Sequence, residues 1–303
     1  MCIFALALEA TEDFPFVLVF NRDEFFGRPT SPVAIQDDGL LCAVDGERGG
    51  TWMGLNTRTG RFAALTNVRC QPVSGGASRG QLVRRVLHED QSPLASAEFT
   101  SFNLLHCVLS PHGARELRLS ANTPEDLGGG GAFRTTTRAV ECGGGRRVLV
   151  KSNDASGKLV SDDGDGGERW PKAHWLQAEV MRVLTAHGSI PAGRAGAEAL
   201  LQLLEPVMSA RSLPPREAEA AATYRATWSH LSDDAEAALQ RAPFIEPLML
   251  HLTNSGGGRY GTVSQTAVFV STSDCCVYYA YRSLHDDAAP GPWDWHKVPL
   301  RQQ

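Results

Sequence analysis

The sequence predicts an α+β domain in which β sheets face each other. Apolar runs of strand length lie towards both ends of the chain, and the segments with helical periodicity are grouped between them. No linker divides the 303 residues, so we expect one domain over residues 1–303. This order of elements is typical of domains in which the sheets pack face to face.

The first two elements are predicted as a β-hairpin. Residues 3–8 and 16–20 are short apolar runs that do not alternate, and polar residues separate them. Runs of this kind are typical of strands that are covered on both faces. Antiparallel pairing of these two strands would bring residues 20–24 back beside residue 2.

Further strands are expected where Val, Phe, Tyr and Thr are abundant. They lie at residues 40–45, 51–56, 61–68, 103–109, 115–119, 147–152, 248–253, 262–270, 275–282 and 294–298.

Three amphipathic helices and one helical insertion are predicted. Ser78 is placed to cap a helix with apolar residues at positions 82, 83, 86 and 87. A second helix runs from Pro171, which a first turn tolerates, towards Gly188, a suitable C-cap. A third lies around residues 200–207, and the Ala- and Glu-rich stretch 214–242 predicts an exposed helical insertion.

Composition excludes several classes of protein. The net charge of −5 and the pI of about 6.0 give no basic field for nucleic acid or an anionic membrane. No run reaches the roughly 18 apolar residues of a membrane span. The four glycine clusters (128–131, 143–145, 164–167 and 256–258) lack the strand-to-helix context of a phosphate loop and predict loops instead.

The seven cysteines indicate a reduced, intracellular protein. Their number is odd and no CxxC motif occurs, whereas disulfide frameworks and zinc sites need regular spacing. The apolar run at the start of the chain is only eight residues long and is followed by Glu9, so it supports neither a signal peptide nor a transit peptide.

Cys2 is the first candidate catalytic residue. If Met1 is removed, the free α-amino group of Cys2, with a pKa of about 7.7–8.0, can serve as the base for its own thiol. The alternative is a small buried residue at the start of a strand. Asp23 and Arg22 follow the second strand, where a carboxylate can hold the amine and an arginine can lower a thiol pKa, although such a segment is commonly a solvated turn.

Asn67 is a further candidate at the end of the strand that follows a predicted tight hairpin. A side-chain amide at such a position can donate to an oxyanion, and the alternative is an ordinary turn asparagine.

Several motifs occur in a fixed order along the first part of the chain. They are Met1-Cys2-Ile3, Asn21-Arg22-Asp23-Glu24-Phe25, Arg28-Pro29, Gly49-Gly50-Thr51-Trp52-Met53-Gly54, Leu65-Thr66-Asn67 and Ser78-Arg79-Gly80. Together they resemble the NRDE-motif family, named for transport and Golgi organization protein 2. The likeness extends over nearly the whole chain, and the stretches 123–147 and 212–243 look like insertions relative to the family.

The NRDE-motif family in turn resembles the cysteine-type N-terminal nucleophile hydrolases, which cleave linear amides. This resemblance implies a four-layer αββα sandwich of two mainly antiparallel sheets. It also implies that Cys2 is the nucleophile, that Asp23 lies near its α-amine, and that Asn67 and Asn153 stabilise an oxyanion.

Two positions depart from the patterns of these families. The hydrolases place an Arg where this chain has Phe20, and Arg22 is the nearby cation that could serve instead. The NRDE-motif family continues Tyr-Gly-Thr with an Arg where this chain has Val263. Loss of that cation is expected to raise the thiol pKa or to weaken binding of an oxyanion or carboxylate.

Two function classes follow, and the sequence leaves both open. One is an amidohydrolase that needs no cofactor. The other is a non-catalytic protein of Golgi organisation, secretion, and lipid or haem homeostasis, which the resemblance implies together with a cytoplasmic location or association with the Golgi or mitochondria. The expected partner is a small amide, a lipid or haem. No CxxCH or paired-histidine spacing marks a haem site, and His106 and His251 are predicted as core histidines.

Overall fold

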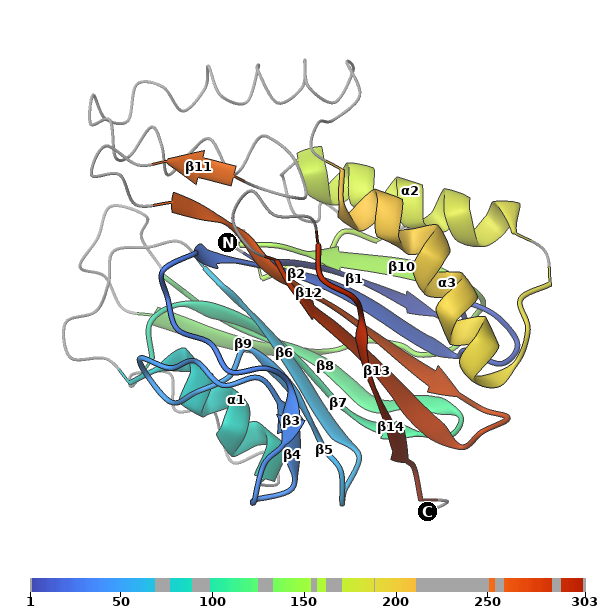
Figure 1. The fold of residues 1–303 in the computed structure, drawn as a ribbon, viewed down its shortest axis with the longest axis horizontal. Helices are drawn as coiled ribbons and strands as arrows, with labels where there is room; N and C mark the ends of the chain where they lie inside the picture. The colour runs from blue at the N-terminus through green and yellow to red at the C-terminus, as the bar shows by residue number, and fades with distance from the viewer. Residues whose placement is uncertain are drawn as a thin grey trace.

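The computed structural model describes residues 2–68, 77–88, 99–124, 133–153, 157–161, 171–187, 189–210, 251–253, 259–284 and 290–301. These residues form two seven-stranded sheets and three helices (Figure 1).

The first sheet contains both ends of the described chain. Its strands lie in the order β10 (Arg147–Lys151), β1 (Ile3–Leu8), β2 (Phe16–Phe25), β12 (Arg259–Ser271), β13 (Cys276–Ser283) and β14 (Asp294–Pro299), and β11 (His251–Thr253) pairs with β12. All of these pairs are antiparallel. The predicted hairpin of the first two strands is confirmed, with Ile3 opposite Asn21 and Leu8 opposite Phe16.

The second sheet is an antiparallel meander in which each strand pairs with the next along the chain. Its strands are β3 (Ala34–Ile35), β4 (Leu40–Cys42), β5 (Met53–Asn56), β6 (Arg61–Asn67), β7 (Phe102–Ser110), β8 (Gly113–Pro124) and β9 (Phe133–Ala139). Gly60, in the turn before β6, has a φ of +74°, and a Cβ there would lie 2.6 Å from the Leu109 carbonyl oxygen. Glycine therefore suits both the turn and the close approach of the strands.

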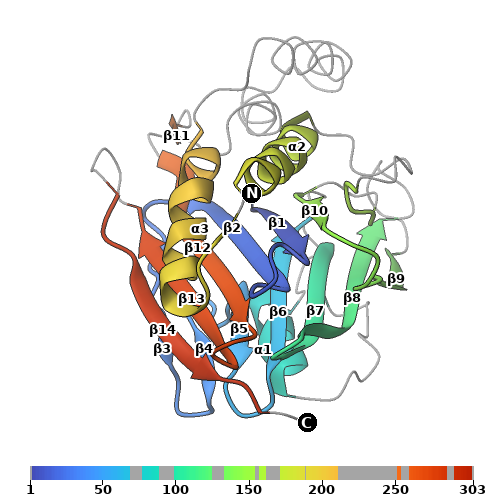
Figure 2. The ribbon, with the colours of Figure 1, turned by 90° about the vertical axis from the view of Figure 1, so that its right-hand side faces the viewer.

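The predicted four-layer αββα sandwich is confirmed by the core contacts. On β1, Phe4, Leu6 and Leu8 point into the core between the two sheets. The alternate residues of β1 pack with α2 (Pro171–Ala186) and α3 (Gly193–Met208) on the outer side of the first sheet. The third helix, α1 (Arg79–His88), covers the outer side of the second sheet, as Figure 2 shows.

The structure differs from the predicted elements mainly at the edges of the second sheet. The strand predicted at 115–119 is longer, at Gly113–Pro124, and the two edge strands β3 and β9 were not predicted. Strand β9 lies within the stretch 123–147 that was interpreted as an insertion. The stretch 212–243 and the predicted helix 214–242 lie outside the described residues, as do three of the glycine clusters.

In the part of the chain that the structure describes, no helix is long and apolar enough to cross a membrane.

Candidate active site

Cys2 lies immediately before β1 and faces the core between the two sheets. Its exposed fraction is 6%, and it packs in the same cluster as Phe4 and Phe20. The register of β1 and β2 ends with Ile3 opposite Asn21, so Cys2 comes next, opposite Arg22. Opposite residues of antiparallel strands share a face, with Cβ atoms about 4.5–5.5 Å apart. The expected approach of residues 20–24 to Cys2 is therefore confirmed.

Asn153 reaches the other side of Cys2. Strand β10 pairs Lys151 with Phe4, and continuing this register by two residues brings Asn153 opposite Cys2. The Asn153 side chain also points between the sheets, because its Nδ2 donates to the backbone carbonyl of Asn67 at the end of β6. The two asparagines that the resemblance implied therefore lie together.

Ser264 extends this arrangement on the opposite side of Arg22. It is paired with Arg22 across β12 and β2. We call Asn153, Cys2, Arg22 and Ser264 the nucleophile row, since they follow one another across four neighbouring strands spaced about 4.8 Å apart.

Two atoms of the nucleophile row are buried without a hydrogen-bond partner among the described residues. They are Asn153 Oδ1 and Ser264 Oγ. The residues are only 2% and 1% exposed, respectively, so both atoms lie away from bulk solvent. No pattern in the sequence singles out Ser264.

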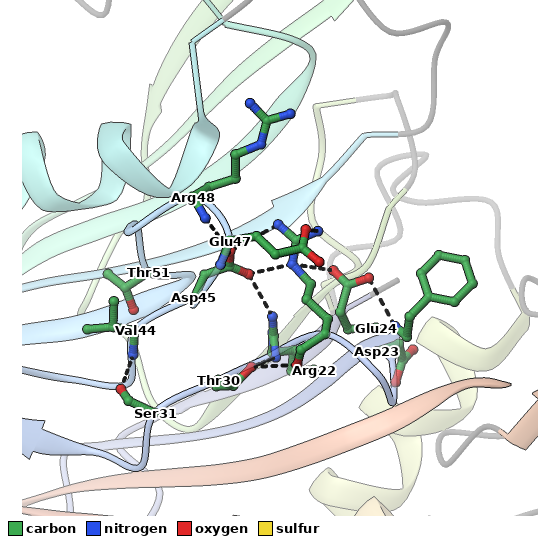
Figure 3. Close-up of polar contacts among 12 residues, drawn as sticks. Arg22, Asp23, Glu24, Thr30, Ser31, Val44, Asp45, Glu47, Arg48 and Thr51 are labelled. Atoms are coloured by element: carbon green, nitrogen blue, oxygen red, sulfur yellow. Dashed lines mark hydrogen bonds and ion pairs between the residues drawn. The ribbon is translucent and has the colours of Figure 1, made fainter. Parts of the chain in front are cut away.

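Arg22 is held by residues that flank strands β3, β4 and β5 of the second sheet. Its Nη1 donates to Thr30 Oγ1 at 2.9 Å, its Nη2 lies 3.2 Å from Asp45 Oδ2, and its guanidinium carbon lies 3.9 Å from the centroid of the Trp52 ring. Asp45 also accepts two hydrogen bonds from Arg28, at 2.6 and 3.0 Å. Figure 3 shows Arg22 between Thr30 and Asp45 in this network. This network ties β2 to the segment that precedes β5.

Asp45 is ionised in this network. Burial raises its pKa, but the hydrogen bond from Arg28, the backbone N–H of Arg48 and the charges of Arg28 and Arg22 outweigh that effect and lower the pKa below 3.8. Asp45 therefore balances the buried charge of Arg22.

Asp23 is buried beside β12 and α2. Its Oδ1 accepts a hydrogen bond of 2.7 Å from Thr262 Oγ1, and its carbonyl accepts one of 3.1 Å from the Tyr260 hydroxyl. Burial raises the pKa of the Asp23 carboxyl, while the positive amino terminus and Lys172 act in the opposite direction. The positive charge that acts on Asp23 here is that of the unprocessed chain, so the role of Asp23 beside the α-amine of Cys2 stays a prediction.

Lys172 is not among the predicted site residues, although the sequence contains a signal for it. The side chain is 0% exposed in the first turn of α2. It stands four residues before Leu176, on the apolar face of that helix. A lysine at such a position requires a polar counterpart, and the Asp23 carboxylate is one group that its charge influences.

The Cys2 thiol favours its neutral form. Burial raises its pKa above the ordinary 9.0, and the Asp23 carboxylate adds to this. The amino terminus, the backbone N–H of Asp23 and the guanidinium of Arg22 act in the opposite direction without reversing it.

Val263 lies at a β-bulge, where the register between β12 and β2 shifts between Thr262 and Ser264. The nearby Arg282 does not supply the missing cation. Its guanidinium donates to Gln265 Oε1 and, at 2.6 Å, to Glu205 Oε1, on the side of the sheet that α3 covers. Phe20 is a packed core residue.

The described residues gather no cluster of metal-binding side chains. No group of three or more His, Cys, Asp or Glu side chains is gathered there to hold a metal ion. His106 is 5% exposed, and its Nε2 is hydrogen-bonded to Ser120 Oγ at 3.0 Å, which confirms it as a core histidine. The side chain of His251 lies outside the described part of the structure.

Comparison with known proteins identifies a family. The family model described as Transport and Golgi organisation 2 matches residues 1–286. The Transport and Golgi organization protein 2 homolog of Bos taurus is 37% identical over 108 residues, which cover 31% of this chain and 39% of that protein. The Homo sapiens homolog is 34% identical over 108 residues with the same coverage. These matches span well under half of the relatives' length.

Two solved structures of conjugated bile acid hydrolase from Clostridium perfringens are also similar, each with 10% sequence identity. One, a mutant, has a TM-score of 0.39 and covers 98% of this chain and 92% of that chain. The other, a variant, has a TM-score of 0.35 and covers 99% of both chains. The fold assignment rests on the strand pairing and core contacts given above.

Proposed function

The chain belongs to the Transport and Golgi organisation 2 family, and from this premise and the geometry of the nucleophile row we propose that it hydrolyses a linear acyl amide with Cys2 as the nucleophile. The observation that carries the proposal is the position of Cys2: second in the chain, on the inner face, between Asn153 and Arg22 and within electrostatic reach of Asp23. A cysteine that served only as packing would not require these polar neighbours.

The reaction begins once Met1 is removed, because only then is the α-amino group of Cys2 free to act as a base. The amine takes the thiol proton while sulfur attacks the amide carbon, so that an S–C bond forms. The C–N bond then breaks, and the same proton passes to the departing nitrogen. Water cleaves the resulting thioester, which releases the acid and restores the thiol.

The remaining residues support this step. Asp23 is assigned to hold the ammonium form of the amine, and Asn67, whose backbone carbonyl faces Asn153, is assigned as the oxyanion donor that the resemblance implies. Arg22, fixed on Trp52 by Asp45, stabilises negative charge on the sulfur from the neighbouring strand position.

The test combines intact mass with turnover. We expect the purified full chain to lack Met1 and to release the amine from an N-acylglycine, whereas a Cys2→Ser variant with the same processed terminus should be at least about tenfold slower. Retention of Met1, or equal turnover by Cys2→Ser, would exclude the proposed nucleophile.

A second candidate is a non-catalytic role in Golgi organisation and secretion, with a lipid or haem as ligand and a cytoplasmic or Golgi- or mitochondrion-associated location. The raised pKa of the buried Cys2 thiol favours it, because a neutral thiol is a weak nucleophile. Its haem version predicts a saturable shift of the haem absorption spectrum on titration with the full chain. Absence of that shift removes haem as the ligand.

A further inference from the structure

The orientation of the Asn153 amide is fixed by its surroundings. Its Nδ2 faces the backbone carbonyl of Asn67. A carbonyl oxygen can only accept, so the NH₂ group must be the one that faces it. The other end of the amide, Oδ1, is therefore an acceptor, and it is buried without a hydrogen-bond partner among the residues described.

The chain around Asn153 is built rigidly enough to hold this orientation. The preceding carbonyl, that of Ser152, accepts hydrogen bonds from Thr66 Oγ1 at 2.5 Å and from Asn103 Nδ2 at 3.3 Å. These bonds come from β6 and β7 of the second sheet, and with the bond to Asn67 they anchor the segment after β10 to it. The Asn153 amide thus has little freedom to turn its oxygen towards another donor.

The unpaired oxygen lies next to the proposed nucleophile. In the nucleophile row Asn153 is the neighbour of Cys2, and both side chains point between the sheets. When the carbonyl carbon of an acyl substrate lies against the Cys2 sulfur, the nitrogen or oxygen atom bonded to that carbon would face Asn153.

We propose that Asn153 Oδ1 accepts a hydrogen bond from the N–H of the substrate amide, so that the site takes N-acyl derivatives of primary amines in preference to esters and N-alkylated amides. This inference rests on the proposed function and deepens it, since it names the substrate class. It assigns Asn153 a specificity-determining role, instead of the oxyanion role that the resemblance implied.

The discrimination follows from hydrogen-bond chemistry. An ester oxygen would set an acceptor against Oδ1, and an N-methyl group would set a methyl against it. In both cases the buried acceptor stays unpaired in the complex, and sites built around a substrate N–H reject analogues that lack it strongly.

Three ligands that differ at one atom test the inference: N-decanoylglycine, N-decanoylsarcosine and O-decanoylglycolate. Binding is measured by calorimetry on the full-length Cys2→Ala variant, and kcat/KM on the processed wild type. We expect the glycine conjugate to bind at least about tenfold more tightly than the other two. Comparable dissociation constants for all three, or no binding of any, would overturn the inference.

Matched variants locate the effect. In the Cys2→Ala background, Asn153→Leu should reduce the preference for the glycine conjugate to near unity. Ser101→Ala removes a buried hydroxyl oxygen that, like Asn153 Oδ1, has no hydrogen-bond partner among the described residues, but Ser101 lies outside the nucleophile row, so this variant should keep the preference. If Asn153→Leu does not fold, the dissociation constants of the three ligands on the Cys2→Ala variant, which retains Asn153, still test the inference.

The two proposals fail in different ways. Selective binding of the glycine conjugate without its cleavage by the processed wild type would refute the hydrolase function and leave the ligand class standing. Cleavage of all three ligands at similar kcat/KM would refute the ligand class and leave the hydrolase function standing.

Discussion

Replacing Asp45 with alanine tests whether the buried charge of Arg22 depends on a single counter-ion. The Arg22 side chain is 5% exposed and that of Asp45 is 12% exposed. Asp45 further accepts two hydrogen bonds from Arg28 and the backbone N–H groups of Glu47 and Arg48. Its removal leaves the Arg22 guanidinium its hydrogen bond to Thr30 and its contact with the face of the Trp52 ring.

The expected loss of stability follows from these contacts. Removing one partner of a buried ion pair costs about 3–5 kcal/mol, because the other charge stays buried without compensation. The lower value, about 3 kcal/mol, applies here, since Arg22 keeps one hydrogen bond and one cation–π contact. At about 2.1 cal/mol/K per residue, this corresponds to a fall in Tm of about 5 °C for a chain of 303 residues.

Arg28→Ala is the matched control. It removes the other arginine of Asp45, but that side chain is 25% exposed, so the variant should lose only about 1 kcal/mol. Urea unfolding followed by circular dichroism and by tryptophan fluorescence measures the loss of unfolding free energy in both variants. If Asp45→Ala is no more destabilising than Arg28→Ala, the buried charge of Arg22 does not need Asp45 and the reasoning fails.

The pH dependence of the same network has a definite sign. The pKa of Asp45 is lower in the folded protein than its ordinary 3.8, so the folded state binds fewer protons at this group. Its contribution to stability is therefore complete above that ordinary value and is lost as the pH falls through the lowered one. Asp45→Ala should show a weaker loss of stability in that acidic range than the wild type.

Three further predictions concern other positions. Ser264→Ala removes a buried hydroxyl without a partner among the described residues and should stabilise the protein by about 1 kcal/mol in urea unfolding; destabilisation would indicate a hidden partner. Gly50→Ala would place a Cβ 2.5 Å from the Gly80 carbonyl carbon and should lower stability by about 2 kcal/mol, whereas Gly143→Ala, with nothing within 4 Å, should not. Burial lowers the pKa of His106 to about 4, so its NMR titration should show no midpoint near 6.5, and its contribution to stability should be lost as the pH falls from 6.5 towards 4.

The sequence predicted the first sheet better than the edges of the second. The runs 3–8 and 16–20 are apolar without alternation, and the structure buries both faces of β1. Strand β9 contains three threonines and two arginines and is mostly exposed, so hydrophobic periodicity could not reveal it. Strand β3 has only two residues, which is too short for any pattern.

The candidate site was predictable along the hairpin and not across the sheets. The approach of Cys2 to residues 20–24 follows from local antiparallel pairing, which sequence spacing determines. The bond from Asn153 to Asn67 joins residues 86 positions apart on different sheets, and nothing local specifies it. Asp45 was missed for the same reason, since its role depends on the packing of its loop against β2.

The raised pKa of Cys2 determines when this site could act. A cysteine that must first release its proton to water is disabled by burial, because the thiolate is the costly form. A cysteine at a processed N-terminus can instead pass its proton to its own amine as it attacks, so a free thiolate need not form in the buried site beforehand. With Met1 still attached, that amine is a peptide N–H without basicity, and the same burial leaves the thiol inert. On the proposed function, removal of one residue therefore separates an inactive fold from an active one, without any change in the sheets that surround Cys2.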